Sequence, residues 1–101
     1  MPKPRIEIPR GAIAEFCKRW RIEELSLFGS VLRDDFGPGS DIDVLVSFER
    51  GSGRSLFDLV DMADELGTIL GRKVDLVCKN GLRNPFRKRE ILATRVVLYA
   101  A

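Results

Sequence analysis

The chain has 101 residues, of which 45% are hydrophobic and 32% charged, and its formal net charge is +2. These values are typical of a small globular domain and exclude a disordered segment, and a charge of +2 is too small to argue for nucleic-acid binding by itself. No apolar run approaches the length of a membrane span, and the start at Met1–Pro4 is not a signal peptide. We expect one domain over residues 1–101, because no linker or repeat interrupts the chain.

Two residue types restrict the chemistry that the chain can support. Histidine is absent from the sequence, which excludes histidine-based triads and histidine–metal sites. Any catalysis must therefore use carboxylates, lysine, hydroxyl groups and bound metal. The two cysteines, Cys17 and Cys78, stand singly in apolar-patterned segments. We therefore expect free thiols in a reducing cytoplasm and no disulfide.

Helical and strand patterns alternate along the first half of the chain. The predicted elements are an amphipathic helix after Pro9 that includes Ile13, Phe16, Cys17 and Trp20, a strand over 25–28, one helical turn over 30–34, a loop over 36–40 and a strand over 41–48. Because strand side chains alternate, Ile42 and Val44 lie on one face of the last strand, and Asp41 and Asp43 lie on the other.

The second half predicts a long helix, a strand, a basic helix and a terminal strand. Ser55 and Asp58 form a capping-box pattern at the start of the long helix, and Gly71 is placed to end it. The apolar stripe expected on this helix comprises Leu56, Leu59, Val60, Ala63 and Leu70. The remaining predicted elements are a strand over 73–77, a basic helix that begins at Pro85 and an edge strand over 96–99.

The most informative stretch is Gly29-Ser30, followed after ten residues by Asp41 and Asp43. A Gly-Ser turn that closes a strand offers backbone N–H groups and a hydroxyl to phosphate oxygens. Two carboxylates one residue apart on a strand point to one face and can jointly hold divalent metal ions. The pattern thus favours phosphoryl or nucleotidyl transfer, and the alternative is a pair of ordinary solvated carboxylates at a strand end.

A third acid and two further polar residues join this pattern. Asp75 lies within the predicted strand 73–77, where it either completes a metal site or pairs with a neighbouring cation, Arg72 or Lys73. We expect the three acids to lie together at the carboxyl ends of adjacent strands.

Each polar residue of the loop has two interpretations. Arg33 either contacts phosphate or is an exposed arginine paired with Asp34. Ser40 either bonds the acids or completes the turn. The basic residues of the last quarter are interpreted as a solvated helix face, with a nucleic-acid or partner surface as the alternative: Arg83, Arg87, Lys88, Arg89 and Arg95.

These residues resemble the minimal nucleotidyltransferase (MNT) family of the polymerase-beta-like nucleotidyltransferase superfamily. The resemblance rests on Gly29-Ser30, Asp41-x-Asp43 and the strand with Asp75, with Arg33, Pro38 and Ser40 at the family's loop positions, and it covers nearly the whole chain. Leu32 and Asp34 depart from the small residues usual there. The resemblance implies an α/β (α+β) fold with a small mixed sheet flanked by helices.

The resemblance also implies an activity and a partner. Members of this family are antitoxins that transfer AMP from ATP, with Mg²⁺, to a tyrosine of a HEPN ribonuclease toxin. Carried over to this chain, it implies that Asp41, Asp43 and Asp75 are catalytic and bind two Mg²⁺ ions, and that Gly29, Ser30, Arg33 and Ser40 bind the nucleotide. A cytoplasmic hetero-oligomer with the toxin follows. Two alternatives stay open: a non-catalytic antitoxin that acts by occlusion, and nucleotidyl transfer to tRNA or a small molecule.

Overall fold

The computed structural model describes residues 8–33, 37, 39–51, 53 and 55–101. The expectations for Asp34, Pro38 and residue 36 lie outside these residues. The elements run along the chain as α1 (Arg10–Arg19), β1 (Ile22–Phe28), the 3₁₀ turn η1 (Gly29–Leu32), β2 (Ile42–Phe48), α2 (Leu56–Leu70), β3 (Val74–Cys78), the 3₁₀ turn η2 (Lys79–Gly81), α3 (Pro85–Thr94) and β4 (Val96–Ala100).

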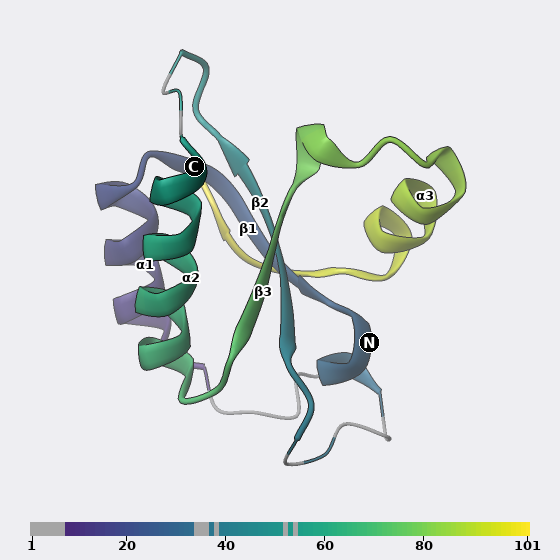
Figure 1. Ribbon diagram of the computed structural model, residues 1–101, viewed down its shortest axis with the longest axis horizontal. Helices are drawn as coiled ribbons and strands as arrows, with labels where there is room; N and C mark the ends of the chain where they lie inside the picture. The colour runs from purple at the N-terminus through teal and green to yellow at the C-terminus, as the bar shows by residue number, and fades with distance from the viewer. Residues whose placement is uncertain (1–7, 34–36, 38, 52, 54) are drawn as a thin grey trace.

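The four strands form one mixed sheet in the order β3-β2-β1-β4. β2 and β3 are parallel, and β1 is antiparallel to both β2 and β4. Figure 1 shows α1 and α2 side by side against one face of this sheet, whereas α3 stands on the other side. The predicted α+β fold, a small mixed sheet flanked by helices, is therefore confirmed, and the strand expected over 25–28 begins earlier, at Ile22.

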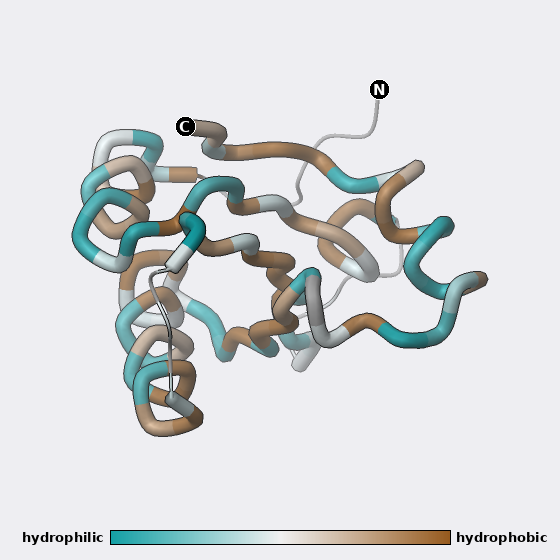
Figure 2. Tube along the Cα trace, turned by 90° about the horizontal axis from the view of Figure 1, so that it is seen from above, coloured by the Kyte–Doolittle hydropathy of each residue, from teal (hydrophilic) through white to brown (hydrophobic). Residues whose placement is uncertain are grey.

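The main core lies between the sheet and the pair α1 and α2. Fully buried side chains from the helices, such as Phe16 and Leu66, meet fully buried side chains from the strands, such as Leu27 and Val44. Each side chain of this size contributes about 1.5–3 kcal/mol when it is completely buried. In Figure 2 the hydrophobic residues concentrate on the strands, as this core requires.

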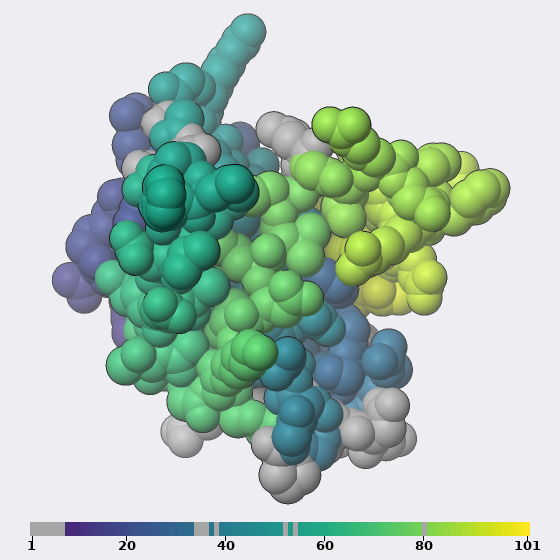
Figure 3. Space-filling view, in the orientation of Figure 1, coloured from purple at the N-terminus to yellow at the C-terminus, as the bar shows by residue number. Residues whose placement is uncertain are grey.

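A second, smaller cluster anchors α3 to the opposite face of the sheet. Ile91 of α3 is buried against Phe28 of β1 and Leu45 of β2. Figure 3 shows the α3 segment standing out from the body of the molecule at the upper right. A small apolar cluster thus attaches α3 to this face of the sheet.

The buried face of α2 differs from the predicted stripe. Its buried residues are Met62, Leu66 and Leu70, while Leu56 is 78% exposed and Val60 is 59% exposed. The helix carries more apolar residues than one face can hold, and packing against the sheet buries the line with the i, i+4, i+8 spacing. The predicted caps are confirmed: Ser55 and Asp58 form a capping box, and Gly71 ends the helix in the left-handed region at φ 73°.

The remaining predictions of local structure are largely confirmed. Both cysteines are free thiols, with Cys17 buried and Cys78 half-buried. α3 begins at Pro85, and β4 forms an edge of the sheet, as expected. The described part of the chain contains no candidate for a membrane-spanning helix.

Candidate active site

The turn after β1 brings the backbone of Gly29 against the carboxylate of Asp43. Phe28, the last residue of β1, is the register partner of Asp43 on β2. Gly29 follows in the left-handed region, with φ 76°, which is strained for a residue with a side chain. A Cβ placed on Gly29 would overlap Oδ2 of Asp43 and would lie 3.2 Å from its Cγ. Glycine is therefore required here both by the turn and by the close approach of the acid.

Parallel pairing of β2 and β3 sets the second and third acids side by side. Asp43 and Asp75 are register partners, so their side chains lie on one face of the sheet at neighbouring positions. Asp41 lies two residues before Asp43, just outside the first residue of β2. Asp43 is half-buried, whereas Asp41 and Asp75 are exposed.

The position of this cluster in the sheet corrects one prediction. The acids lie at the amino ends of β2 and β3, and the expectation of carboxyl ends is wrong. Because β1 is antiparallel to β2, the carboxyl end of β1 lies beside the amino ends of β2 and β3. The antiparallel pairing therefore brings the Gly29 turn to the acids.

Three carboxylates in this small space affect the ionisation of Asp43. Burial raises the pKa of the Asp43 carboxyl, and the negative charges of Asp75 and Asp41 raise it further. The positive charges of Arg33 and Arg87 lower the pKa of the same carboxyl by less, so its pKa lies above the ordinary value. The site thus has an excess of negative charge around Asp43.

Two serines organise the loop that leads into β2. The Ser30 hydroxyl donates to the backbone carbonyl of Asp41 at 3.5 Å, which ties the turn after β1 to the first acid. The Ser40 hydroxyl accepts a hydrogen bond from the backbone N–H of Gly37 at 3.2 Å. Ser40 therefore completes the turn, which was one of the two interpretations of this residue.

An arginine that the sequence analysis did not assign to the site holds the same loop. The guanidinium of Arg72, which follows the end of α2, donates to the backbone carbonyl of Ser40 at 2.7 Å and to that of Gly37. Arg72 is half-buried and lies next to Lys73, whose carbonyl accepts from the N–H of Ile42 at 2.9 Å. No local pattern marks this role, because the loop and Arg72 are more than thirty residues apart in the chain.

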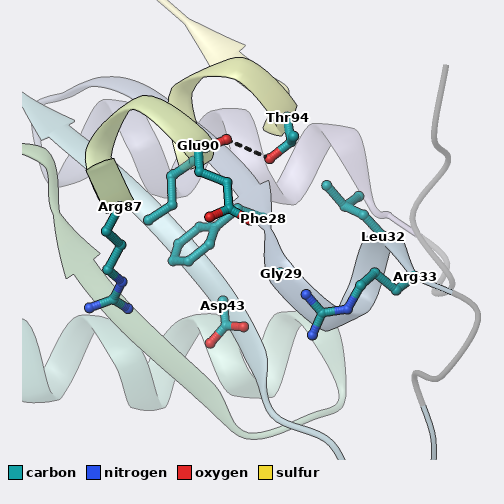
Figure 4. Close-up of a pocket in the computed structure, with 9 residues that line it drawn as sticks. Phe28, Gly29, Leu32, Arg33, Asp43, Arg87, Glu90 and Thr94 are labelled. Atoms are coloured by element: carbon teal, nitrogen blue, oxygen red, sulfur yellow. Dashed lines mark hydrogen bonds between the residues drawn. The ribbon is translucent and has the colours of Figure 1, made fainter. Parts of the chain in front are cut away.

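A pocket of about 460 Å³ opens beside Asp43, between α3 and the turn after β1. Figure 4 shows Arg33 and Arg87 on either side of the Asp43 carboxylate, with the ring of Phe28 above it in this view. The residues that line the pocket are Phe28, Gly29, Leu32, Arg33, Asp43, Arg87, Glu90, Ile91 and Thr94. Sequence reasoning named Gly29, Arg33 and Asp43 of these, and it missed the contribution of α3.

The arrangement of the three acids limits how they can hold a metal ion. Among the residues that the structure describes, no group of three or more acidic or cysteine side chains is arranged to hold a metal ion alone. Mg²⁺, however, commonly binds through one or two carboxylates together with substrate phosphates, and it keeps several waters. The excess negative charge at Asp43 and the nearby turn of Gly29 fit such a shared site.

A family model and individual relatives place this chain in the same sequence family. The sequence model of the family described as the nucleotidyltransferase domain matches residues 10–98 of this chain. A relative from Methanocaldococcus jannaschii, named as a candidate protein adenylyltransferase, is 42% identical over 86 residues, which cover 85% of this chain and 88% of the relative. The protein adenylyltransferase MntA of Thermococcus cleftensis is 35% identical over 74 residues, which cover 73% of each chain.

Comparison with solved structures gives the same fold. A candidate minimal nucleotidyltransferase superposes with a TM-score of 0.71 at 34% identity and covers 86% of each chain. A chain from the structure of a tri-AMPylated Shewanella oneidensis HEPN toxin in complex with MNT antitoxin superposes with a TM-score of 0.66 at 19% identity, over 91% of this chain and 70% of that one. At this lower identity the likeness shows the fold alone.

Proposed function

The chain belongs to the nucleotidyltransferase domain family, and on that basis we propose that it transfers AMP from ATP to a tyrosine hydroxyl of a HEPN-family toxin. In this role the chain is an antitoxin and forms a hetero-oligomer with the toxin. The observation that carries the proposal is the contact between Gly29 and Asp43, which sets a phosphate-binding turn against a carboxylate cluster. Relatives named as protein adenylyltransferases, and a neighbouring fold solved with an AMPylated HEPN toxin, support the acceptor class.

The residues around the pocket have separate roles in the proposed nucleotidyl transfer. Backbone N–H groups at Gly29 and Ser30 bind the triphosphate, and the Arg33 guanidinium adds positive charge at the same turn. Asp41, Asp43 and Asp75 would hold two Mg²⁺ ions together with the phosphates. When bound, Mg²⁺ supplies stabilisation of negative charge on the α-phosphate and on the departing pyrophosphate.

The reaction joins the acceptor oxygen to the α-phosphorus and breaks the bond to pyrophosphate. The proton of the attacking hydroxyl goes to a carboxylate, a role that we assign to Asp75. Asp75 and Asp41 are exposed, so an acceptor that arrives from outside can reach them. A small acceptor is bound best in an enclosed pocket, whereas a tyrosine on a protein brings its own support to an open site.

The test follows the phosphate that is transferred. Purified chain, a HEPN-family partner and Mg²⁺ are incubated with ATP that is radiolabelled at either the α- or the γ-phosphate. Transfer of AMP predicts that the partner retains the α-label and not the γ-label, and that EDTA prevents labelling. Retention of the γ-label would identify a phosphoryl transferase, and the proposal would be wrong.

A second candidate function, inhibition by occlusion, is favoured by an exposed apolar surface at the start of α2. Leu56 and Val60 are mostly exposed, and Phe57 is 83% exposed, which is unusual for three neighbouring large apolar residues. Such a surface can bind a partner without chemistry. Inhibition of the toxin that is complete and reversible in the absence of both ATP and Mg²⁺ would favour this function over transfer.

A further inference from the structure

One face of α3 is turned toward the carboxylate cluster. Arg87, Glu90, Ile91 and Thr94 follow the i, i+3, i+4, i+7 spacing of a single helix face, and all four line the pocket. Ile91 fixes this face to the sheet, because it is buried against Phe28 and Leu45. Arg87 lies one turn before Ile91, so the packing that buries Ile91 also directs Arg87 toward the pocket.

The two ends of α3 are held in place. The Asn84 side chain caps the amino end by accepting from the N–H groups of Phe86 at 3.0 Å and Arg87 at 3.2 Å. At the carboxyl end, Arg95 pairs with Glu24 of β1 at 3.0 Å. The Asn84 cap, the buried Ile91 and the Arg95–Glu24 ion pair therefore fix the position of α3, and with it that of Arg87, relative to the sheet.

Arg87 and Arg33 face Asp43 from two different elements. In Figure 4 their guanidinium groups lie on opposite sides of the Asp43 carboxylate, one extending from α3 and the other from the residue after η1. Both arginines line the same pocket as Asp43. The pocket is thus lined by two cations that converge on one acid.

Arg87 differs from the arginines that have structural roles. Arg19, Arg21 and Arg95 each pair with a glutamate. Within the described part of the chain, the Arg87 guanidinium makes neither an ion pair nor a side-chain hydrogen bond. A guanidinium carries five donors in a planar fork that matches phosphate oxygens, so its donors are available to a ligand in the pocket.

We propose that Arg87 binds the phosphate chain of the nucleotide from the side opposite Arg33. The inference rests on the proposed nucleotidyl transfer and adds to it a phosphate ligand that comes from α3. Asp43 would repel a phosphate chain, and the two arginines beside it offset that repulsion. Arg89 is the natural comparison, because it is an exposed arginine of the same helix that does not line the pocket.

The test measures binding and not turnover. The affinities of AMP-PNP with Mg²⁺, and of adenosine as a probe without phosphates, are measured by isothermal titration calorimetry for wild type, Arg87→Ala, Arg87→Lys and Arg89→Ala. Loss of a charge-assisted contact predicts that Arg87→Ala weakens AMP-PNP binding roughly 10- to 100-fold. Arg87→Lys lies between this variant and wild type, Arg89→Ala matches wild type, and adenosine binding does not change.

The other outcomes distinguish failure of the inference about Arg87 from failure of the proposed function. If Arg87→Ala binds AMP-PNP as wild type does, Arg87 is not a phosphate ligand and the proposed function is untouched. If adenosine binding falls as much as AMP-PNP binding, Arg87 acts through the shape of the pocket and the inference is wrong. If wild type itself binds no AMP-PNP, both the inference and the proposed function fail. Thermal melts of all four proteins establish that they are folded.

Discussion

Replacement of Gly29 by alanine tests the contact at the centre of the site. The change introduces a side chain at φ 76° and places its Cβ over Oδ2 of Asp43. Gly51 provides a matched control, because it has φ 78° and a Cβ built there meets no described atom within 4 Å. The comparison of Gly29→Ala with Gly51→Ala therefore separates the cost of the backbone conformation from the cost of the clash.

The magnitudes follow from these two costs. A left-handed conformation costs an L-residue about 1–2 kcal/mol, and the reduced entropy of the unfolded chain offsets about 0.4–1 kcal/mol of it. Both variants share this net loss in the free energy of unfolding. Only Gly29→Ala must also displace the Asp43 side chain, and an off-rotamer side chain costs about 0.5–1.5 kcal/mol. For a chain of this size the difference corresponds to several degrees in Tm.

Thermal melts in EDTA and AMP transfer provide the two measurements. Gly29→Ala should melt below Gly51→Ala and should lose transfer, because Asp43 is displaced, whereas Gly51→Ala should retain transfer. In an Asp43→Ala background the two glycine substitutions should cost the same. Equal Tm values in the wild-type background, together with normal transfer by Gly29→Ala, would show that the close approach of Gly29 and Asp43 is not required.

Three further predictions concern stability and the loop. Burial and neighbouring carboxylates raise the pKa of the Asp43 carboxyl, so folding favours the protonated form and ionisation lowers stability as the pH rises. In EDTA, Asp43→Asn should thus melt at or above wild type at neutral pH, and the difference should shrink toward pH ~4; a difference independent of pH would refute this. Arg72→Ala removes the donor to the Gly37 and Ser40 carbonyls and should lower the free energy of unfolding by about 1.5–3 kcal/mol in urea melts, with slower transfer; no change in either would contradict the role of Arg72. Ser55→Ala removes the cap of α2 and should cost about 1 kcal/mol while transfer stays normal; lost transfer in a folded protein would contradict this.

Local chemistry in the sequence predicted much of the fold and part of the site. The capping box at Ser55 and the glycine end at Gly71 depend on neighbouring residues, so their patterns were sufficient. Strand alternation likewise predicted that Asp41 and Asp43 lie near each other, and the charge of Asp41, just before β2, does act on Asp43. These features need no knowledge of how distant segments pack.

Other features depend on packing between distant segments, which no local pattern encodes. The pairing of Asp43 with Asp75 requires the parallel register of β2 and β3, and the approach of the Gly29 turn to these acids follows from the antiparallel pairing of β1 with β2. The stripe on α2 was wrong at Leu56 and Val60, because the helix has two apolar faces and the sheet buries one. Arg87 was assigned to a solvated surface because only the burial of Ile91 turns that side of α3 toward the pocket.

The rate of AMP transfer by Asp41→Asn tests most directly whether the acids form a catalytic site. Asp41 is exposed, and it is the backbone carbonyl of this residue that accepts from Ser30, so the substitution removes a charge and leaves this bond intact. Asp61→Asn, at an exposed acid on α2, is the matched control. With α-labelled ATP and a HEPN-family partner, Asp41→Asn should transfer slower by roughly two orders of magnitude or more, with a Tm in EDTA equal to or above that of wild type. Transfer at the wild-type rate, or loss of transfer only through unfolding, would contradict a catalytic carboxylate site at Asp41.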